Sequence, residues 1–99
     1  MSDKYILNDK IPVPVHDLLE WAEWMETADR RVNFDMVGDT KISTVFLGLD
    51  RSFGGNRPVL FETMIFGGPH DGYQERCSTW EEAEIEHNKA KSLVIISLN

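Results

Sequence analysis

The residues that could do chemistry in this sequence are few, and they do not form a catalytic signature. His70 and Asp71 are adjacent, and Asp50 and Glu62 are further carboxylates that a hydrolase could use. A neighbouring histidine and carboxylate do not by themselves make a catalytic pair, because a nucleophile or a reacting group must lie within reach of them. The sequence therefore predicts a protein that is not an enzyme.

Metal and thiol chemistry are also poorly supported. The three histidines, His16, His70 and His87, lack the spacing of a metal site on a helix, so we expect no bound metal and no cofactor. Cys77 is the single cysteine, which excludes an internal disulfide and a thiolate metal cluster. We expect an ordinary thiol on a strand.

Glu62 interrupts an apolar strand pattern and is flanked on its own face by Leu60, Met64 and Phe66. A carboxylate in such surroundings needs a cation or hydrogen-bond donors to compensate for lost water. Its candidate cationic partners are Arg30, Arg31, Arg57 and Arg76. Glu62 is therefore either a structural ion pair at the sheet surface or a recognition group within an apolar patch.

Two glycine-rich loops, residues 50–58 and 67–72, carry further candidate binding residues. Gly54 and Gly55 lead into a strand, whereas a phosphate-binding loop leads directly into a helix. An alternative function is nevertheless the binding or sequestering of a small nucleotide ligand in a pocket at a dimer interface. Its anion contacts would be Arg51, Arg57 and Arg76.

Aromatic residues are candidates for a protein interface. Trp24 lies off the main apolar stripe of its predicted helix, so it either widens the packed face or stands near the surface, where tryptophan is enriched at binding hot spots. Phe53 either tucks under the sheet or projects from its loop. The candidate binding residues are Trp24, Arg51, Phe53, Arg57, Glu62, His70, Asp71 and Arg76.

Two β-rich apolar runs on either side of the 50–58 loop predict the central hairpin of a sheet. Both runs carry apolar side chains on both faces, so we expect helices on one face and a loop or a second subunit on the other. Residues 32–37 predict a strand before this hairpin, and residues 73–77 predict a strand after it. Residues 5–7 and the proline-containing segment 11–15 predict a short edge strand or a packed arm.

Two helices are predicted. The first begins near His16 or Asp17, whose carboxylate can cap free amides, and is expected to lay one face on the sheet. The second begins with a capping box formed by Thr79 and Glu82, and we expect its His87 to be packed and hydrogen-bonded. Its predicted apolar stripe consists of Trp80, Ala83, His87, Ala90 and Val94. The β-branched tail, residues 92–99, is expected to add an edge strand or to mediate self-association.

Together these elements predict a single α+β domain over residues 1–99, in which an antiparallel meander of three to four strands packs against two α-helices. A homodimer that completes the cover of the sheet is the alternative arrangement. Within so short a chain, two helices do not necessarily cover both faces.

The formal net charge is −7, from 17 acidic and 10 basic residues. Such a field repels phosphate backbones, so direct nucleic-acid binding is not expected, and it favours a basic protein partner. The sequence has no run of about 18 apolar residues and no apolar signal-peptide core, so we expect a soluble protein of the cytoplasm without a membrane partner.

Four motifs, ADRRV, STVFLGLD, LFETMIFGG and STWEEAE, resemble those of a family of small proteins encoded by bacteriophages and prophages. The resemblance runs from about Tyr5 to Lys91. It implies no activity, and it implies a setting, which is the cytoplasm of a bacterial host.

We therefore expect a small acidic accessory protein that is not an enzyme and that binds and modulates, by inhibition, a bacterial host or anti-phage defence protein. In one version the contact mimics nucleic acid through clustered carboxylates. The two candidate clusters are Asp17, Glu20, Glu23 and Glu26 on the first helix, and Glu81, Glu82, Glu84 and Glu86 on the second.

Overall fold

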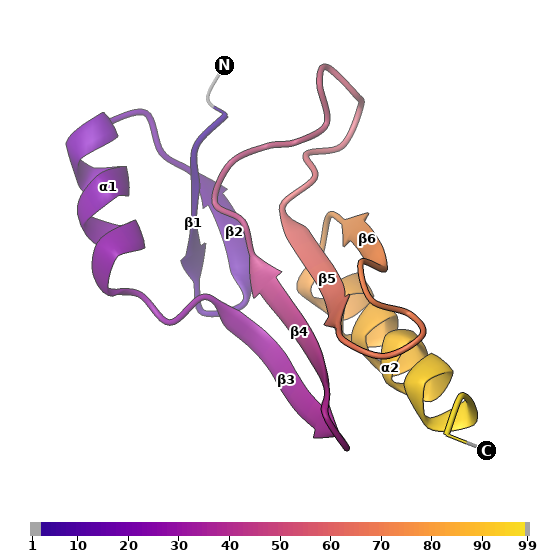
Figure 1. Ribbon diagram of the computed structural model, residues 1–99. Coiled ribbons are helices and arrows are strands. Elements are labelled where there is room, and N and C mark those ends of the chain that lie inside the picture. Colours follow the sequence, from indigo (N-terminus) through magenta and orange to yellow (C-terminus); the bar gives the residue numbers. More distant parts are fainter. Residues whose placement is uncertain (1–2, 99) are drawn as a thin grey trace.

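The computed structural model describes residues 3–98, which form two helices and two antiparallel sheets (Figure 1). The larger sheet is a meander of four strands in sequence order, β3 (Arg31–Val37), β4 (Thr40–Phe46), β5 (Phe61–Phe66) and β6 (Gln74–Cys77). The predicted α+β class is confirmed. The antiparallel meander, predicted to have three to four strands, is also confirmed and has four.

The hairpin of β4 and β5 is central, as predicted, and pairs Phe46 with Phe61 and Ile42 with Ile65. Because side chains alternate along a strand, these four residues share one face. All four are fully buried. This face therefore forms the core of the sheet.

The core face is covered by α2 (Trp80–Ile96), which passes behind β5 and β6 in Figure 1. The helix begins as predicted, because Thr79 accepts a hydrogen bond from the amide of Glu82 while the Glu82 carboxylate accepts from the amide of Thr79. Its predicted apolar stripe is also confirmed at the four residues that the helix buries, Ala83, His87, Ala90 and Val94.

The expectation of an edge strand in the tail is wrong for the described residues, since α2 continues to Ile96. Val94 packs against Ile42 and Ile65, and this burial outweighs the weak helix propensity of the β-branched run. Asn99, at the end of that tail, lies outside the described residues.

The N-terminal segments form a separate hairpin of β1 (Tyr5–Asn8) and β2 (Ile11–Pro14). Tyr5 and Leu7 of β1 pack against the core cluster that contains Phe46. The hairpin thus extends the cover of the core face beyond the start of α2.

The first helix, α1 (Leu18–Thr27), is capped by Asp17, whose Oδ1 accepts from the amide of Leu19 at 2.9 Å. The structure differs from expectation in its placement, because none of its residues is buried and it stands to one side of the sheet (Figure 1). It reaches the core through Trp24, whose ring meets Phe46 edge-on at 5.7 Å.

Gly48 anchors α1. Its carbonyl accepts hydrogen bonds from the amide of Tyr5 at 2.8 Å and from Trp21 Nε1 at 3.1 Å. Gly48 has a φ of 78°, and a Cβ there would lie 2.6 Å from Met25 Sδ. The Met25 side chain of α1 therefore lies so close to the backbone of Gly48 that only glycine fits there without strain.

Candidate functional site: the open face of the sheet

The side of the four-stranded sheet opposite α2 is the main candidate surface, and we call it the open face. Strand register and alternation place eleven side chains on it, because their cross-strand partners alternate with the buried residues. They are Arg31, Phe34, Met36, Lys41, Ser43, Val45, Glu62, Met64, Phe66, Gln74 and Arg76.

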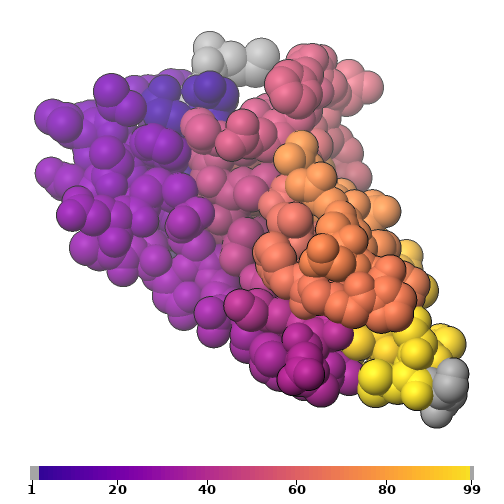
Figure 2. Space-filling model, in the orientation of Figure 1, coloured from indigo at the N-terminus to yellow at the C-terminus, as the bar shows by residue number. Residues whose placement is uncertain are grey.

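The centre of the open face is apolar and in contact with solvent. Met36 is 55% exposed and Phe66 is also exposed, while Phe34, Val45 and Met64 are partly exposed. Trp24, Tyr5 and α2 all pack on the other side, against the core face. Figure 2 shows the magenta to pink atoms of β4 and β5 reaching the surface between the purple and orange parts of the chain. The two-sided apolar pattern predicted for the hairpin is thus real, and one of its sides lacks a cover among the described residues.

The open face carries three cations and one carboxylate, although the chain as a whole has a net charge of −7. The guanidinium of Arg31 lies 4.6 Å from the ring centroid of Phe34, and Lys41 Nζ lies 5.9 Å from that of Phe66. These cation–π contacts hold positive charge directly over the apolar centre. The third cation is Arg76.

Glu62 is the carboxylate of the open face, and the structure settles its partner. Arg76 Nε donates to Glu62 Oε2 at 2.9 Å, and the amide of Gln74 donates to the same oxygen. Of the four arginines considered from sequence, register selects Arg76, because Glu62 and Arg76 are paired across β5 and β6. Glu62 and Arg76 are thus a structural ion pair that also lies on the open face.

The loop residues lie elsewhere. Phe53 projects into solvent with 92% of its surface exposed, and it adopts a positive φ of 53°. Arg51 is exposed, and Arg57 donates to Glu82 Oε1 at 3.0 Å. Asp50 holds this loop closed, because its carboxylate accepts from the amides of Ser52 and Val59 at 2.8 and 2.9 Å.

His70 and Asp71 make separate contacts. His70 Nε2 lies 2.7 Å from Ser97 Oγ, and Asp71 Oδ1 accepts from the amide of Gly67 at 2.7 Å. The 50–58 loop precedes β5 and the 67–72 turn follows it, so the two glycine-rich segments lie at opposite ends of this strand (Figure 1). Within one chain they do not line a common pocket.

A buried polar network centred on His87 was only partly foreseen, as a packed histidine. His87 Nε2 lies 2.8 Å from Asp35 Oδ2, and His87 Nδ1 lies 2.8 Å from Thr44 Oγ1. Thr44 in turn lies 2.7 Å from Thr63 Oγ1, and Lys91 donates to the other oxygen of Asp35 at 3.3 Å.

The order of hydroxyl, imidazole and carboxylate in this network matches that of a hydrolase relay. Thr44 and His87 are nevertheless both 0% exposed, so no substrate reaches the hydroxyl. The network therefore supplies hydrogen-bond partners to buried polar groups. The sequence features that could have indicated it are two threonines on the buried side of an apolar hairpin and a histidine in the apolar stripe of a helix.

Cys77 is the other group with nucleophilic potential. Burial raises the pKa of its thiol to about 11, with smaller contributions from the carboxylates of Glu82 and Glu86. The thiolate is the reactive form, so Cys77 is held in its unreactive state at neutral pH.

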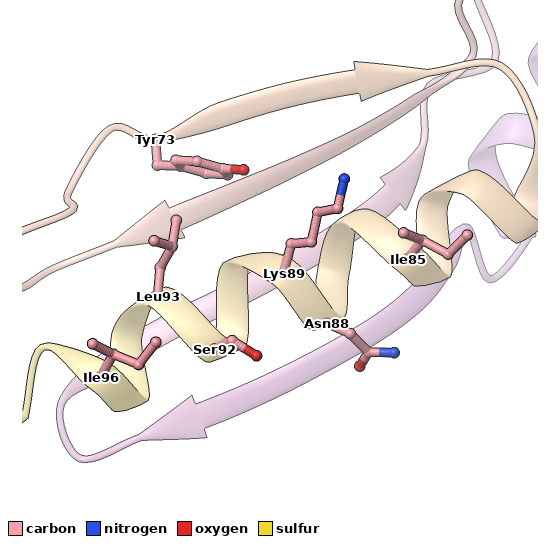
Figure 3. Close-up of a pocket in the computed structure, with 7 residues that line it drawn as sticks. All are labelled: Tyr73, Ile85, Asn88, Lys89, Ser92, Leu93 and Ile96. Atoms are coloured by element: carbon pink, nitrogen blue, oxygen red, sulfur yellow. The ribbon is translucent and has the colours of Figure 1, made fainter.

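A shallow groove runs along the outer side of α2 (Figure 3). Ile85, Asn88 and Ser92 follow one another along the helix, and the ring of Tyr73 lies above Leu93. Ile85 is 55% exposed, as Met36 is on the open face. The groove is an exposed apolar strip, and it contains none of the residues predicted from sequence.

The two acidic clusters differ in their pairing. On α2, Glu82 accepts from Arg57, Glu84 accepts from Trp80 Nε1, and Glu86 pairs with Lys89. On α1, Glu20, Glu23 and Glu26 have no side-chain partner among the described residues. Glu20, Glu23 and Glu26 of α1 are therefore available for contacts outside the chain, whereas Glu81 is the one carboxylate of the α2 cluster without a side-chain partner among the described residues.

Within residues 3–98, no group of three or more histidine, cysteine or acidic side chains is placed to hold a metal ion. Neither helix of the described chain has the length and apolar character needed to cross a membrane. No protein-family model, curated protein or solved structure matches the chain.

Proposed function

We propose that this protein is a phage-type accessory protein without enzymatic activity, which binds a bacterial host or anti-phage defence protein through the open face and inhibits it. The observation that carries the proposal is the uncovered apolar centre of the open face. A sheet that is apolar on both sides is ordinarily covered on both sides, so an uncovered face of this kind is suited to a partner.

The composition of the open face favours a protein partner. Two methionines, Met36 and Met64, lie beside Phe34 and Phe66, and flexible methionine side chains adapt to apolar groups of a partner. The chain as a whole carries a net charge of −7 and repels a phosphate backbone, which disfavours a nucleic acid as the partner of this face.

The charges of the open face favour a partner segment that combines apolar side chains with carboxylates. Arg76 is already paired with Glu62, whereas Arg31 and Lys41 contact aromatic rings and have no carboxylate partner among the described residues. An acidic partner segment would supply carboxylates to Arg31 and Lys41. It would also be steered to this face, because the rest of the surface is acidic and repels it.

The test compares two substitutions matched in exposure, Met36→Glu on the open face and Ile85→Glu on α2, since both residues are 55% exposed. Tagged wild type and both variants are used to capture proteins from a bacterial lysate. We expect one stoichiometric partner with the wild type and with Ile85→Glu, and at least about tenfold weaker binding with Met36→Glu, because a carboxylate replaces an apolar contact and repels the acidic segment.

The purified partner then provides the functional measurement. We expect its activity to fall when wild type or Ile85→Glu is added, and to be unaffected by Met36→Glu. Equal binding by Met36→Glu and wild type, or a wild-type protein that captures no partner, would overturn the proposal. Weaker binding at higher ionic strength is expected as well, because exposed charges are screened.

A further inference from the structure

A second surface of the same chain is complementary to the open face. Helix α1 has ten residues, none of them buried, and its first two leucines, Leu18 and Leu19, are 62% and 72% exposed. Short isolated helices are marginal in water, and most helical stability in proteins comes from packing of an apolar side. The exposed leucines of α1 therefore represent a packing surface that the single chain leaves unused.

The charge of α1 is opposite to that of the open face. Residues 11–29 contain five carboxylates and no lysine or arginine. Glu20, Glu23 and Glu26 recur at intervals of three residues, which places them along one side of the helix. Leucines beside unpaired carboxylates are the combination of groups that the open face is suited to accept.

The chain cannot make this contact with its own α1 in the described arrangement. Trp24 holds α1 against Phe46 on the core side of the sheet, and Trp21 Nε1 holds it to the carbonyl of Gly48. The acidic helix and the basic open face belong to different sides of one molecule, so they meet only when two molecules associate.

We propose that, in the free protein, the open face of each copy is covered by α1 of a second copy. This inference rests on the proposed function, since it names a competitor for the same face. In a twofold arrangement each copy donates its own α1 and receives that of its partner, so every favourable contact is made twice. A bacterial target must displace α1, and self-association therefore lowers the apparent affinity for the target as the concentration of the protein rises.

The oligomeric state is measured by light scattering and by sedimentation over a wide range of concentration. Three double variants, each changing the net charge by four, are compared with the wild type. Glu23→Lys with Glu26→Lys reverses charges on α1, and Arg31→Glu with Lys41→Glu reverses charges on the open face. Glu75→Lys with Glu81→Lys is the control, because Glu75 and Glu81 are exposed and belong to neither surface. Circular dichroism melts verify that each variant folds.

We expect the wild type and the control to dimerise, and either reversed variant alone to associate at least about tenfold more weakly, because like charges then face each other. An equimolar mixture of the two reversed variants is the decisive sample. In the mixed dimer the lysines of one α1 meet the glutamates of the other open face, while the remaining contact is unchanged from the wild type. Dimer formation is therefore expected to return in the mixture.

A wild type that stays monomeric at every concentration overturns the inference, and so does a mixture that stays monomeric. A dimer that neither reversed variant weakens places the interface elsewhere and also overturns it. The two failures are distinguishable, because a monomeric wild type whose partner binding is lost with Met36→Glu contradicts the dimer and leaves the proposed function standing.

Discussion

At the scale of single residues, the imidazole of His87 is the buried side chain whose two polar atoms both require a hydrogen-bond partner. It is completely buried, and both of its nitrogens lie within hydrogen-bond distance of a partner. No buried side-chain nitrogen or oxygen among the described residues lacks a partner. Such a network joins β3, β4, β5 and α2, and it fixes the position of the helix over the sheet more specifically than apolar contacts alone.

Substituting His87→Ala is expected to destabilise the protein by about 2–4 kcal/mol, because it leaves a cavity and removes the partner of Thr44 and Asp35. Urea unfolding followed by tryptophan fluorescence measures this change. The matched control is His70→Ala, which removes an exposed hydrogen bond to Ser97 and is expected to cost about 0.5 kcal/mol or less. Equal losses in the two variants would contradict a structural role for the network.

Contacts of single residues were predicted correctly from sequence where they depend only on residues close together in the chain. The capping box of Thr79 and Glu82 depends on residues three apart, so the sequence contains everything that determines it. The partner of Glu62 depended on strand register, and four arginines remained equivalent until β6 was placed beside β5. The link from His87 to Asp35 spans 52 positions of sequence, and periodicity carries no information about it.

At the scale of elements, the same distinction explains the placement of α1. Its start was predictable from Asp17, but its position is determined by contacts with Gly48 and Phe46, both far along the chain. The strands, in contrast, follow from local runs of β-branched and aromatic residues bounded by turn residues, and their order follows from antiparallel pairing of neighbours in sequence. The end of α2 was predicted wrongly because the weak helix propensity of the β-branched run was given more weight than the packing of Val94 against Ile42 and Ile65, which lie far from it along the chain.

The anchoring of α1 is tested by Gly48→Ala, with Gly38→Ala as its control. Both glycines have positive φ, 78° and 60°, so both substitutions introduce similar backbone strain, about 1–2 kcal/mol. A Cβ at Gly38 would meet nothing within 4 Å, whereas one at Gly48 would lie 2.6 Å from Met25 Sδ. We expect the Gly48 variant to lose more stability in urea unfolding, and equal losses would mean that Met25 moves aside without cost.

At the scale of the whole molecule, the charge distribution decides which surfaces can meet. The chain carries a net charge of −7, yet the open face gathers Arg31, Lys41 and Arg76 around apolar side chains. Composition alone favoured a basic partner. The folded chain instead has a basic face and, on another surface, an acidic helix. This separation of charge could not be predicted from composition, because it depends on the strand register that determines which side chains point away from α2.

Acid is expected to destabilise the whole molecule, because three carboxyls have a pKa lowered by folding. A hydrogen bond from His87 lowers the pKa of Asp35, against the opposing effect of burial and with the help of Lys91. Burial raises the pKa of Asp50, but the amides of Val59 and Ser52 donate to its carboxylate and leave the pKa below its usual value. Arg57 and the amide of Ser78 lower the pKa of Glu82.

The sign of the effect follows from proton uptake. As the pH falls through about 4, these carboxyls take up protons in the unfolded chain before they do so in the folded chain, so the unfolded state is favoured. Their contribution is fully present above the unfolded pKa and is lost as the pH falls through the lower folded values. The urea midpoint is therefore expected to fall between about pH 6 and about pH 3, with a shallower dependence in Asp35→Asn, since one of the three groups no longer titrates. A midpoint that is constant or rises on acidification would show that these hydrogen bonds do not favour the charged carboxylates in solution.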